Sequence, residues 1–359
     1  MNARPYEGLA VGLVGCGEIV QFAHVPIYLR LGFHIRCVFD PDASASARVI
    51  GQVPDARLAG SIQEIIDDPA LDFIDVAIPP ERQLEVALAA IKAGKHLLCQ
   101  KPLAPSADEA RRIVAAAGER GLWLVVNHQM RWAPFIRHTA EALVREALGP
   151  VVHGRINWVR PGRIAAGHWL AREPRLLCLF NTIHVIDALR YLFGEPYALS
   201  GLVRSDRRHA SAGETTVEAW LQWRMGAVVS ITDRVSARHS YTNTDVVLEF
   251  ERGTMLGRIG LWDRYPLPSP DIVRYQALGA PESTLVSDSE CWLPDAFAGP
   301  ITELAEAILH GRSPTVDGEN AVRNLELVEA IYDSSAAGRA VVLTDAQPPR
   351  RNQRGAGGR

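Results

Sequence analysis

The first half of the chain alternates five short apolar runs with segments long enough to form helices. Runs of this length without helical periodicity are typical of buried strands. Strands separated by helical segments predict a doubly wound parallel sheet with right-handed crossovers. We therefore expect an α/β fold whose first domain is of the Rossmann type. The predicted strands are Leu9–Val14, His34–Phe39, Phe73–Ile78, His96–Cys99 and Leu122–Val126.

The first run leads directly into a glycine turn. Gly15 and Gly17 flank one cysteine and precede a helix-like segment that extends to Leu31. Glycines permit positive φ and a close approach of the backbone to a pyrophosphate, while the amino terminus of the helix offers free N–H groups. Val20 stands where a third glycine usually allows close packing of helix and strand. The alternative is a tight turn without a ligand.

The second run ends at Asp40, about twenty-five residues after the first glycine. A dinucleotide fold places at this point the acid that binds the ribose hydroxyls. A carboxylate there would repel the additional phosphate of NADP, so Asp40 favours NAD. The alternative is that Asp40, Pro41 and Asp42 start a turn and cap the following helix.

The fourth run ends in a polar pair, Gln100 and Lys101, and is stopped by Pro102. Proline cannot donate to a sheet ladder, so Lys101 is expected at the carboxyl end of a strand. Ligands bind at that edge of open parallel sheets. A lysine there could polarise an oxygen or move a proton, because its pKa shifts readily on burial. The alternative is a surface lysine that follows a core strand.

The second half changes character after a predicted helix from Pro134 to Ala147. We expect residues 1–149 to form the Rossmann domain, 150–345 a second α+β domain with a large, mostly antiparallel sheet, and 346–359 a disordered tail. Two helices, Ile301–His310 and Gly318–Ala337, are expected near the end. The predicted strands of the second domain are Val151–Val159, Tyr197–Arg204, Val217–Trp223, Ala227–Asp233, Asp245–Glu251 and Gly338–Leu343.

One segment between these strands predicts an amphipathic helix. Its apolar residues recur at helical spacing, Asn181 is a candidate amino-terminal cap and Gly194 ends it. His184 and Asp187 are three residues apart and can share a face, as can Asp187 and Arg190. By themselves these residues are compatible with a surface ion pair beside a hydrogen-bonded histidine.

Together, several of these motifs resemble the Gfo/Idh/MocA oxidoreductases. Members of that family join a Rossmann domain to a second domain with a large open sheet, and mostly oxidise or reduce sugars, inositols and related polyols with NAD or NADP. The family signature is Glu-Lys-Pro; the triplet here is Gln100, Lys101 and Pro102, so the lysine carries over and the glutamate does not. The segments that carry the resemblance are Gly15–Gly17, Asp40, Ile78–Pro80, Ala93–Leu103 and Asn320–Gly338.

The resemblance implies a role for each matched residue. Lys101 and His184 would act at the substrate hydroxyl, although Phe180 replaces an aspartate that many members carry four residues before the histidine. Cofactor contacts are expected from Gly15, Gly17, Glu18, Ile19, Asp40, Ile78, Pro79, Gln100 and Lys101. Substrate contacts are expected from Gln129, Arg131, Asn181 and Asp187. Trp169 is a candidate ring for stacking on a sugar, and the alternative for it is ordinary packing. The open sheet implies a homodimer or homotetramer.

The amino-acid composition indicates which classes of partner the chain is suited to bind. A net charge of −3 gives no electrostatic reason to bind nucleic acid. The five cysteines form no CxxC pair, no HExxH-type spacing occurs, and no apolar run approaches membrane-spanning length. We expect a cytoplasmic protein with a small carbohydrate-like substrate, NAD as cofactor, and neither a metal nor a membrane partner.

Two other functions remain compatible with the sequence. One is an enzyme that retains NAD and uses transient oxidation to eliminate or hydrolyse a glycoside. The other is a noncatalytic dinucleotide-binding sensor, which Val20, Gln100 and Phe180 would suit. The leading hypothesis is a dehydrogenase that transfers hydride between the nicotinamide and a hydroxyl or carbonyl of a sugar or polyol.

Overall fold

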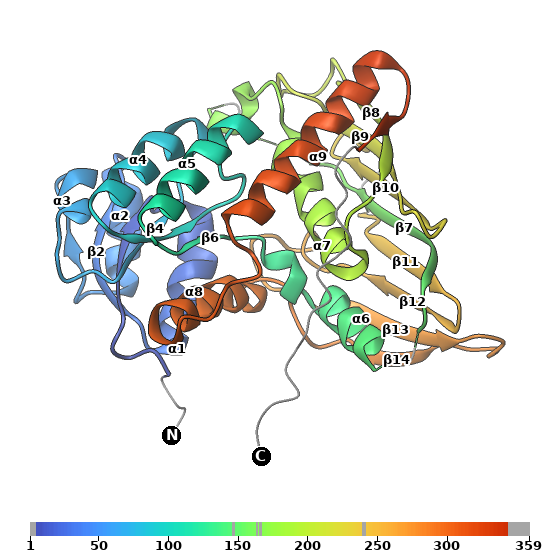
Figure 1. Cartoon of the computed structure of the whole chain (residues 1–359), viewed down its shortest axis with the longest axis horizontal. Helices are drawn as coiled ribbons and strands as arrows, with labels where there is room; N and C mark the ends of the chain where they lie inside the picture. Colours follow the sequence, from blue (N-terminus) through green and yellow to red (C-terminus); the bar gives the residue numbers. More distant parts are fainter. Residues whose placement is uncertain (1–4, 146–147, 163, 165–166, 239–241, 344–359) are drawn as a thin grey trace.

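The computed structural model describes residues 5–145, 148–162, 164, 167–238 and 242–343. Two sheets stand side by side, with helices between and around them (Figure 1). The expected tail, 346–359, lies outside the described residues.

The first sheet has six parallel strands in the order β3-β2-β1-β4-β5-β6, which confirms the Rossmann prediction. Five strands match predicted runs. The two-residue edge strand β3 was missed because both of its residues are exposed and carry no apolar pattern. The strands are β1 (Ala10–Val14), β2 (His34–Phe39), β3 (Arg57–Leu58), β4 (Phe73–Val76), β5 (His96–Cys99) and β6 (Leu124–Val126).

Local signals explain where the helices of this half begin and end. Ser106 accepts a hydrogen bond from the Glu109 N–H and its hydroxyl donates to the Glu109 carboxylate, so the two residues that predicted a capping box pair at the start of α5. Gly94, just beyond α4, has a φ of 80°. The helices are α1 (Val25–Leu31), α2 (Ala43–Gln52), α3 (Ile62–Ile66), α4 (Pro80–Lys92), α5 (Ala107–Glu119) and α6 (Pro134–Val144), with a π-helical turn η1 (Val20–His24) before α1 and a 3₁₀ turn η2 (Gln129–Trp132) before α6.

The second sheet has nine strands in the order β14-β13-β12-β11-β7-β10-β9-β8-β15. Its pairs are antiparallel except for β7 with β10, which run parallel in the middle of the sheet. The three strands β12 to β14 extend it beyond the predicted set. The strands are β7 (Val151–Val159), β8 (Ala198–Arg204), β9 (Thr216–Gln222), β10 (Val228–Arg234), β11 (Asp245–Phe250), β12 (Gly253–Arg258), β13 (Ile272–Ala277), β14 (Thr284–Ser287) and β15 (Val341–Val342).

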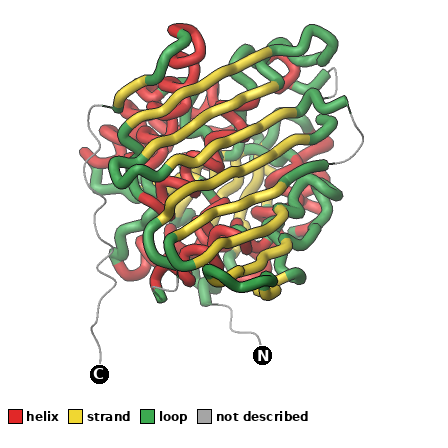
Figure 2. Tube along the Cα trace, turned by 90° about the vertical axis from the view of Figure 1, so that its right-hand side faces the viewer, coloured by secondary structure: helices red, strands yellow, loops and turns green. Residues whose placement is uncertain are grey.

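One face of this sheet is covered and the other is open. Residues along β9 and β10 alternate between buried and partly exposed, as expected for a half-buried antiparallel sheet. Helices lie behind the sheet and leave its outer face uncovered by the chain (Figure 2). The helices of this half are α7 (Ile183–Phe193), α8 (Ala298–His310) and α9 (Gly318–Ala337), with short turns η3 (Trp169–Arg172), η4 (Cys178–Thr182) and η5 (Asp295–Phe297).

The last two helices connect the halves. Helix α8 packs against β5 and β6 of the first sheet, and α9 contacts both α5 and β8. The Val126 N–H donates to the carbonyl of Val316, just before α9. Helix α7 packs against α9 and against η2, which follows β6 at the carboxyl edge of the Rossmann sheet. None of the described helices is long and apolar enough to span a bilayer.

The start of α7 differs from the prediction. Asn181 is not its amino-terminal cap, because the chain forms the π-helical turn η4 first and α7 begins at Ile183 without a side-chain cap. The preceding turn satisfies backbone groups that a capping side chain would otherwise satisfy. Gly194 ends the helix as predicted, with a φ of 78°.

Candidate active site at the carboxyl edge of the Rossmann sheet

The two glycines of the turn after β1 differ in their surroundings. Gly15 has a φ of 99°, and a Cβ on it would lie 2.3 Å from the carbonyl oxygen of Ala77. Any larger residue would therefore clash with the end of β4. Gly17 is exposed, and a Cβ there would meet nothing within 4 Å. The turn thus leaves accessible backbone where a pyrophosphate binds in folds of this kind.

Asp40 lies at the carboxyl end of β2 and is tied to that turn. Its carboxylate accepts the N–H of Cys16 at 2.8 Å and the N–H of Asp42 at 2.8 Å. Each carboxylate oxygen keeps further acceptor capacity for hydroxyl groups. Asp42, rather than Asp40, caps α2 by accepting the Ser44 N–H.

The residues expected to contact the cofactor follow this same edge. Cys16 and the interiors of the strands are buried. Among the expected contact positions beyond the strand ends, Gly15 is buried and the others are half-buried or exposed. A dinucleotide fits an edge of this kind, because its pyrophosphate would meet the turn and its ribose would meet Asp40. The half-buried or exposed positions are Gly17, Glu18, Ile19, Asp40, Ile78, Pro79, Gln100 and Lys101.

A buried network holds Gln100 beside Lys101. The His24 Nδ1 donates to Asp75 at 2.6 Å, and Tyr28 donates to the same carboxylate oxygen at 2.9 Å. The His24 Nε2 then accepts the side-chain amide of Gln100 at 3.2 Å. In turn, the Gln100 oxygen accepts the Lys101 N–H at 2.9 Å. This arrangement fixes the backbone of Lys101 through the side chain of Gln100.

Sequence reasoning missed His24, Asp75 and Gln83. The signal for Asp75 was a carboxylate inside an otherwise apolar strand, which requires a buried partner. The Gln83 amide lies 2.8 Å from the carbonyl oxygen of Pro102 and 3.1 Å from that of Gln100, so it fixes the turn that carries Lys101. No pattern in the sequence distinguishes Gln83 from other polar residues of α4.

Lys101 reaches from this edge to the start of the second half. Its ammonium donates to the backbone carbonyl of Phe180 at 2.6 Å. Phe180 occupies the position where the resembled family often has an aspartate, so the side chain at this position offers the lysine no carboxylate. Burial lowers the pKa of the Lys101 ammonium to about 8.

His184 lies at the beginning of α7 and is 7% exposed. Its Nδ1 is buried and has no hydrogen-bond partner among the described residues. Burial, followed by the nearby charges of Lys101 and His128, holds the pKa of His184 well below its usual value. The imidazole is therefore neutral near pH 7, and one of its two ring nitrogens carries no proton.

Unpaired polar atoms and aromatic rings surround these two groups. The Trp292 ring meets His184 edge-on, with centroids 5.7 Å apart. His128 Nδ1, Gln129 Oε1 and Trp292 Nε1 are buried without a hydrogen-bond partner in the described part of the chain. Burial lowers the pKa of His128 to about 4, so this histidine is also neutral near pH 7.

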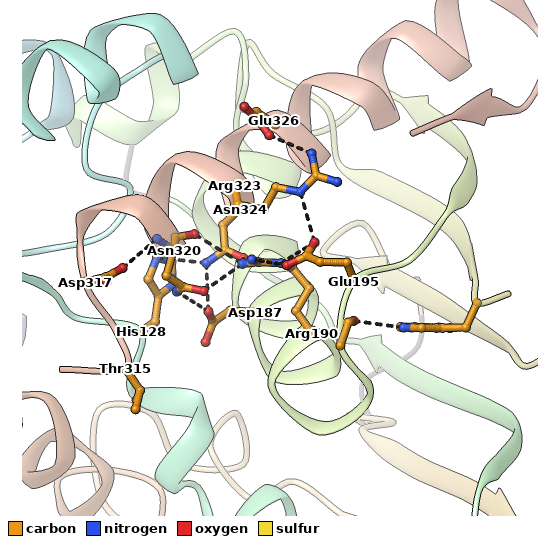
Figure 3. Close-up of polar contacts among 12 residues, drawn as sticks. His128, Asp187, Arg190, Glu195, Thr315, Asp317, Asn320, Arg323, Asn324 and Glu326 are labelled. Carbon is orange, nitrogen blue, oxygen red and sulfur yellow. Dashed lines mark hydrogen bonds and ion pairs between the residues drawn. The ribbon is translucent and has the colours of Figure 1, made fainter. Parts of the chain in front are cut away.

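Asp187 forms a buried ion pair with Arg131. Its contacts with Asn320 and Asn324 are drawn in Figure 3. Arg131 donates two hydrogen bonds to the Asp187 carboxylate, at 2.8 and 2.7 Å. Asn320 and Asn324 of α9 donate to the same carboxylate. Burial opposes ionisation of Asp187, but the Arg131 charge outweighs it and holds the carboxyl pKa well below its usual range. His184 is not hydrogen-bonded to Asp187.

The other expected substrate residues are placed differently. Trp169 is 37% exposed in η3, with its ring edge-on to Phe180 at a centroid distance of 5.4 Å. Asn181 lies in η4. Burial raises the pKa of the Asp233 carboxyl, and a hydrogen bond with the Asn181 side chain offsets part of that rise. Gln129 follows His128 at the start of η2 and is buried, and its side-chain oxygen has no hydrogen-bond partner among the described residues. The described residues contain no cluster of three or more His, Cys, Asp or Glu side chains suited to a metal.

Comparison with known proteins agrees with this architecture over nearly the whole chain. The chain is 29% identical over 342 residues to the D-apiose dehydrogenase of Paraburkholderia graminis, which covers 92% of this chain and 88% of that enzyme. It is 23% identical to scyllo-inositol 2-dehydrogenase (NADP(+)) of Bacillus subtilis, over 95% of this chain and 97% of that enzyme.

A solved structure has the same fold. The oxidoreductase of Agrobacterium radiobacter in complex with NAD+, L-tartaric acid and magnesium superposes with a TM-score of 0.82 at 21% identity, over 93% of this chain and 98% of that one. Residues 9–128 match the oxidoreductase family with an NAD-binding Rossmann fold, and residues 141–343 match its C-terminal alpha/beta domain. The chain therefore belongs to the Gfo/Idh/MocA family of oxidoreductases.

Proposed function

We propose that this protein is an NAD-dependent dehydrogenase that acts on a CH–OH group of a neutral sugar or polyol. The observation that supports the proposal is that Lys101, at the edge that carries the glycine turn and Asp40, donates to Phe180 in the second half of the chain and acts electrostatically on His184. The groups around them are neutral hydrogen-bonding atoms and aromatic rings, which suit a polyhydroxylated, uncharged substrate.

In the proposed reaction, the Lys101 ammonium donates a hydrogen bond to the carbinol oxygen and stabilises the negative charge that develops on it. Neutral His184 accepts the hydroxyl proton on its unpaired Nδ1. When bound, the nicotinamide would accept the hydride that leaves the carbinol carbon, or would donate it in the reverse direction. His128 and Gln129 offer buried hydrogen-bonding atoms that could hold a neighbouring hydroxyl group in place.

The experiment that tests this function is an assay of NAD reduction with a panel of aldoses, anhydrosugars and inositols. D-apiose and scyllo-inositol belong in the panel because two relatives are named for them. Turnover of at least one member with net formation of NADH supports the proposal. Release of a glycoside or an eliminated group without net NADH would instead indicate transient oxidation. Absence of both reactions across the panel, with NAD still bound, would contradict catalysis.

The preference for NAD over NADP is proposed to rest on Asp40. We expect Asp40→Asn to weaken NAD binding about 10- to 150-fold, since a hydrogen bond to a charged group contributes ~1.5–3 kcal/mol. The same change should weaken NADP binding less, because it removes repulsion of the 2′-phosphate. Cofactor titration by protein fluorescence measures both dissociation constants. Asp55→Asn, an exposed aspartate elsewhere in the same domain, is the matched control. Equal losses for the two cofactors would refute the selective role.

We also propose that the outer face of the nine-stranded sheet mediates self-association. Trp220 and Leu202 are 43% and 36% exposed on β9 and β8. Large apolar side chains on an uncovered sheet face are suited to burial against a second copy. Light scattering coupled to size-exclusion chromatography measures the mass, and a monomer at all concentrations would contradict this assembly.

A further inference from the structure

A cavity of about 650 Å³ lies away from the catalytic region, at the ends of β8, β9 and β10. Neighbouring strands bring three of its residues into one row, because Arg204 pairs with Thr216 and Thr216 pairs with Arg234. The two arginine Cα atoms are thus about two strand spacings apart, roughly 10 Å. The lining residues are Arg204, Ser205, Asp206, Arg207, Arg208, Thr216, Arg234, Ser236 and Arg238.

Positively charged side chains outnumber negatively charged ones in the lining of this cavity. Its lining contains five arginines and one aspartate, in a chain whose net charge is −3. Asp206 lies 3.8 Å from Arg238, which is a loose ion pair. Within the described parts of the chain, no ion pair joins Arg204, Arg207, Arg208 or Arg234 to a carboxylate. The nearest outward carboxylate on β9, Glu218, accepts a hydrogen bond from Thr232 instead.

An unpaired nitrogen of Arg234 is a second observation that points to a ligand in this cavity. Its Nε is buried and has no hydrogen-bond partner in the described residues. A buried charged donor without an acceptor is costly, whereas an oxyanion in the cavity would satisfy it. Guanidinium groups pair with phosphate oxygens through two parallel hydrogen bonds, so a row of arginines is better suited to phosphate than to an uncharged sugar.

The cavity is separated from the catalytic region by the sheet itself. Asp233 points to the covered face, where it accepts hydrogen bonds from Arg160 and from Thr182, two residues before His184. Arg234 is the next residue of β10 and, by strand alternation, points to the opposite face. A ligand at Arg234 would therefore not occupy the site of hydride transfer.

We propose that this cavity binds a small phosphorylated organic anion, such as a sugar phosphate. Its volume lies within the range of small-molecule sites and exceeds what a single phosphate fills. The arginines bind the phosphate group, and the hydroxyls of Ser205, Thr216 and Ser236 are available to the rest of the molecule. This inference does not depend on the identity of the dehydrogenase substrate.

The test is isothermal titration of the full chain with glucose 6-phosphate, inorganic phosphate and glucose, in excess NAD so that the glycine turn is occupied. We expect glucose 6-phosphate to bind at physiological salt and glucose to give no comparable binding. Arg204→Gln and Arg234→Gln should each weaken glucose 6-phosphate binding at least 10-fold. Arg155→Gln is the matched control, because Arg155 is exposed on the same outer face but does not line the cavity.

Three results would overturn the proposal. One is that neither glucose 6-phosphate nor inorganic phosphate binds. Another is that Arg155→Gln and Arg234→Gln weaken binding equally, which indicates diffuse electrostatic attraction. The third is that Arg204→Gln and Arg234→Gln weaken glucose 6-phosphate binding and also change the mass in solution, which assigns these arginines to a contact between copies. If inorganic phosphate binds as tightly as glucose 6-phosphate, the site recognises the phosphate group alone, and its proposed preference for an organic phosphate is wrong.

Discussion

A Lys101→Met variant is expected to lose about 10²- to 10⁴-fold in kcat/KM, the range for removing one positioned proton donor or electrostatic group. Methionine has a similar length and keeps the apolar stem, but it cannot donate to an alkoxide. The buried Gln100 and Gln83 contacts act on the backbone of this turn and do not use the ammonium. NAD binding should therefore persist within a few-fold.

The measurement compares steady-state turnover with cofactor titration for the same preparation. Lys92→Met, at an exposed lysine of α4, is the matched control and should behave like the unmodified chain. Full turnover by Lys101→Met would refute the role of the ammonium. Loss of NAD binding in parallel with turnover would show instead that the lysine acts mainly on the cofactor.

The pH dependence of the unmodified enzyme distinguishes two roles for the same lysine. Burial lowers the pKa of Lys101 to about 8, so the ammonium form is lost as the pH rises through that value. If Lys101 acts as the donor, kcat/KM for alcohol oxidation falls through pH 8. If the neutral amine acts as the base, the rate rises there. The pKa of His184 is depressed, so its protonation should reduce the rate only well below pH 6.5.

Most of the fold was predictable from the chain because its signals are local. Apolar runs, the capping box at Ser106 and the glycines after helices fix where elements begin and end. The edge strand β3 has no such signal, and parallel pairing of β7 with β10 depends on contacts between segments far apart in the sequence. Long-range pairing of this kind cannot be derived from periodicity.

The candidate site was predictable only in part. A lysine before a proline at a strand end and a histidine on an amphipathic helix are visible in the sequence. What each side chain meets is not, because the partners come from distant elements. Lys101 meets the carbonyl of Phe180, and Gln100 meets His24 from η1. With uncharged groups at positions 100 and 180, the structure gives Lys101 no carboxylate partner, which is consistent with its lowered pKa.

Asp187 was expected to touch substrate, yet its contacts favour a positioning role. Its carboxylate accepts hydrogen bonds from Arg131, Asn320 and Asn324, which belong to two other elements. Arg131 also donates to the carbonyl of Thr315, just before α9. The carboxylate therefore holds η2, α7 and α9 together directly behind His128 and Gln129.

An Asp187→Asn variant is accordingly expected to lower the free energy of unfolding by about 3–5 kcal/mol, because it leaves the Arg131 charge buried without a counterion. Urea denaturation measures the loss, with exposed Asp288→Asn as the matched control. The pKa of Asp187 is depressed, so its contribution is fully present above the unfolded-state pKa of about 4 and is lost as the pH falls toward the folded-state pKa. The difference between variant and unmodified chain should therefore stay constant from pH 7 to pH 5 and shrink in stronger acid. A difference below 1 kcal/mol at pH 7 would mean that the pair contributes little to folding, and a direct role at the substrate would regain support.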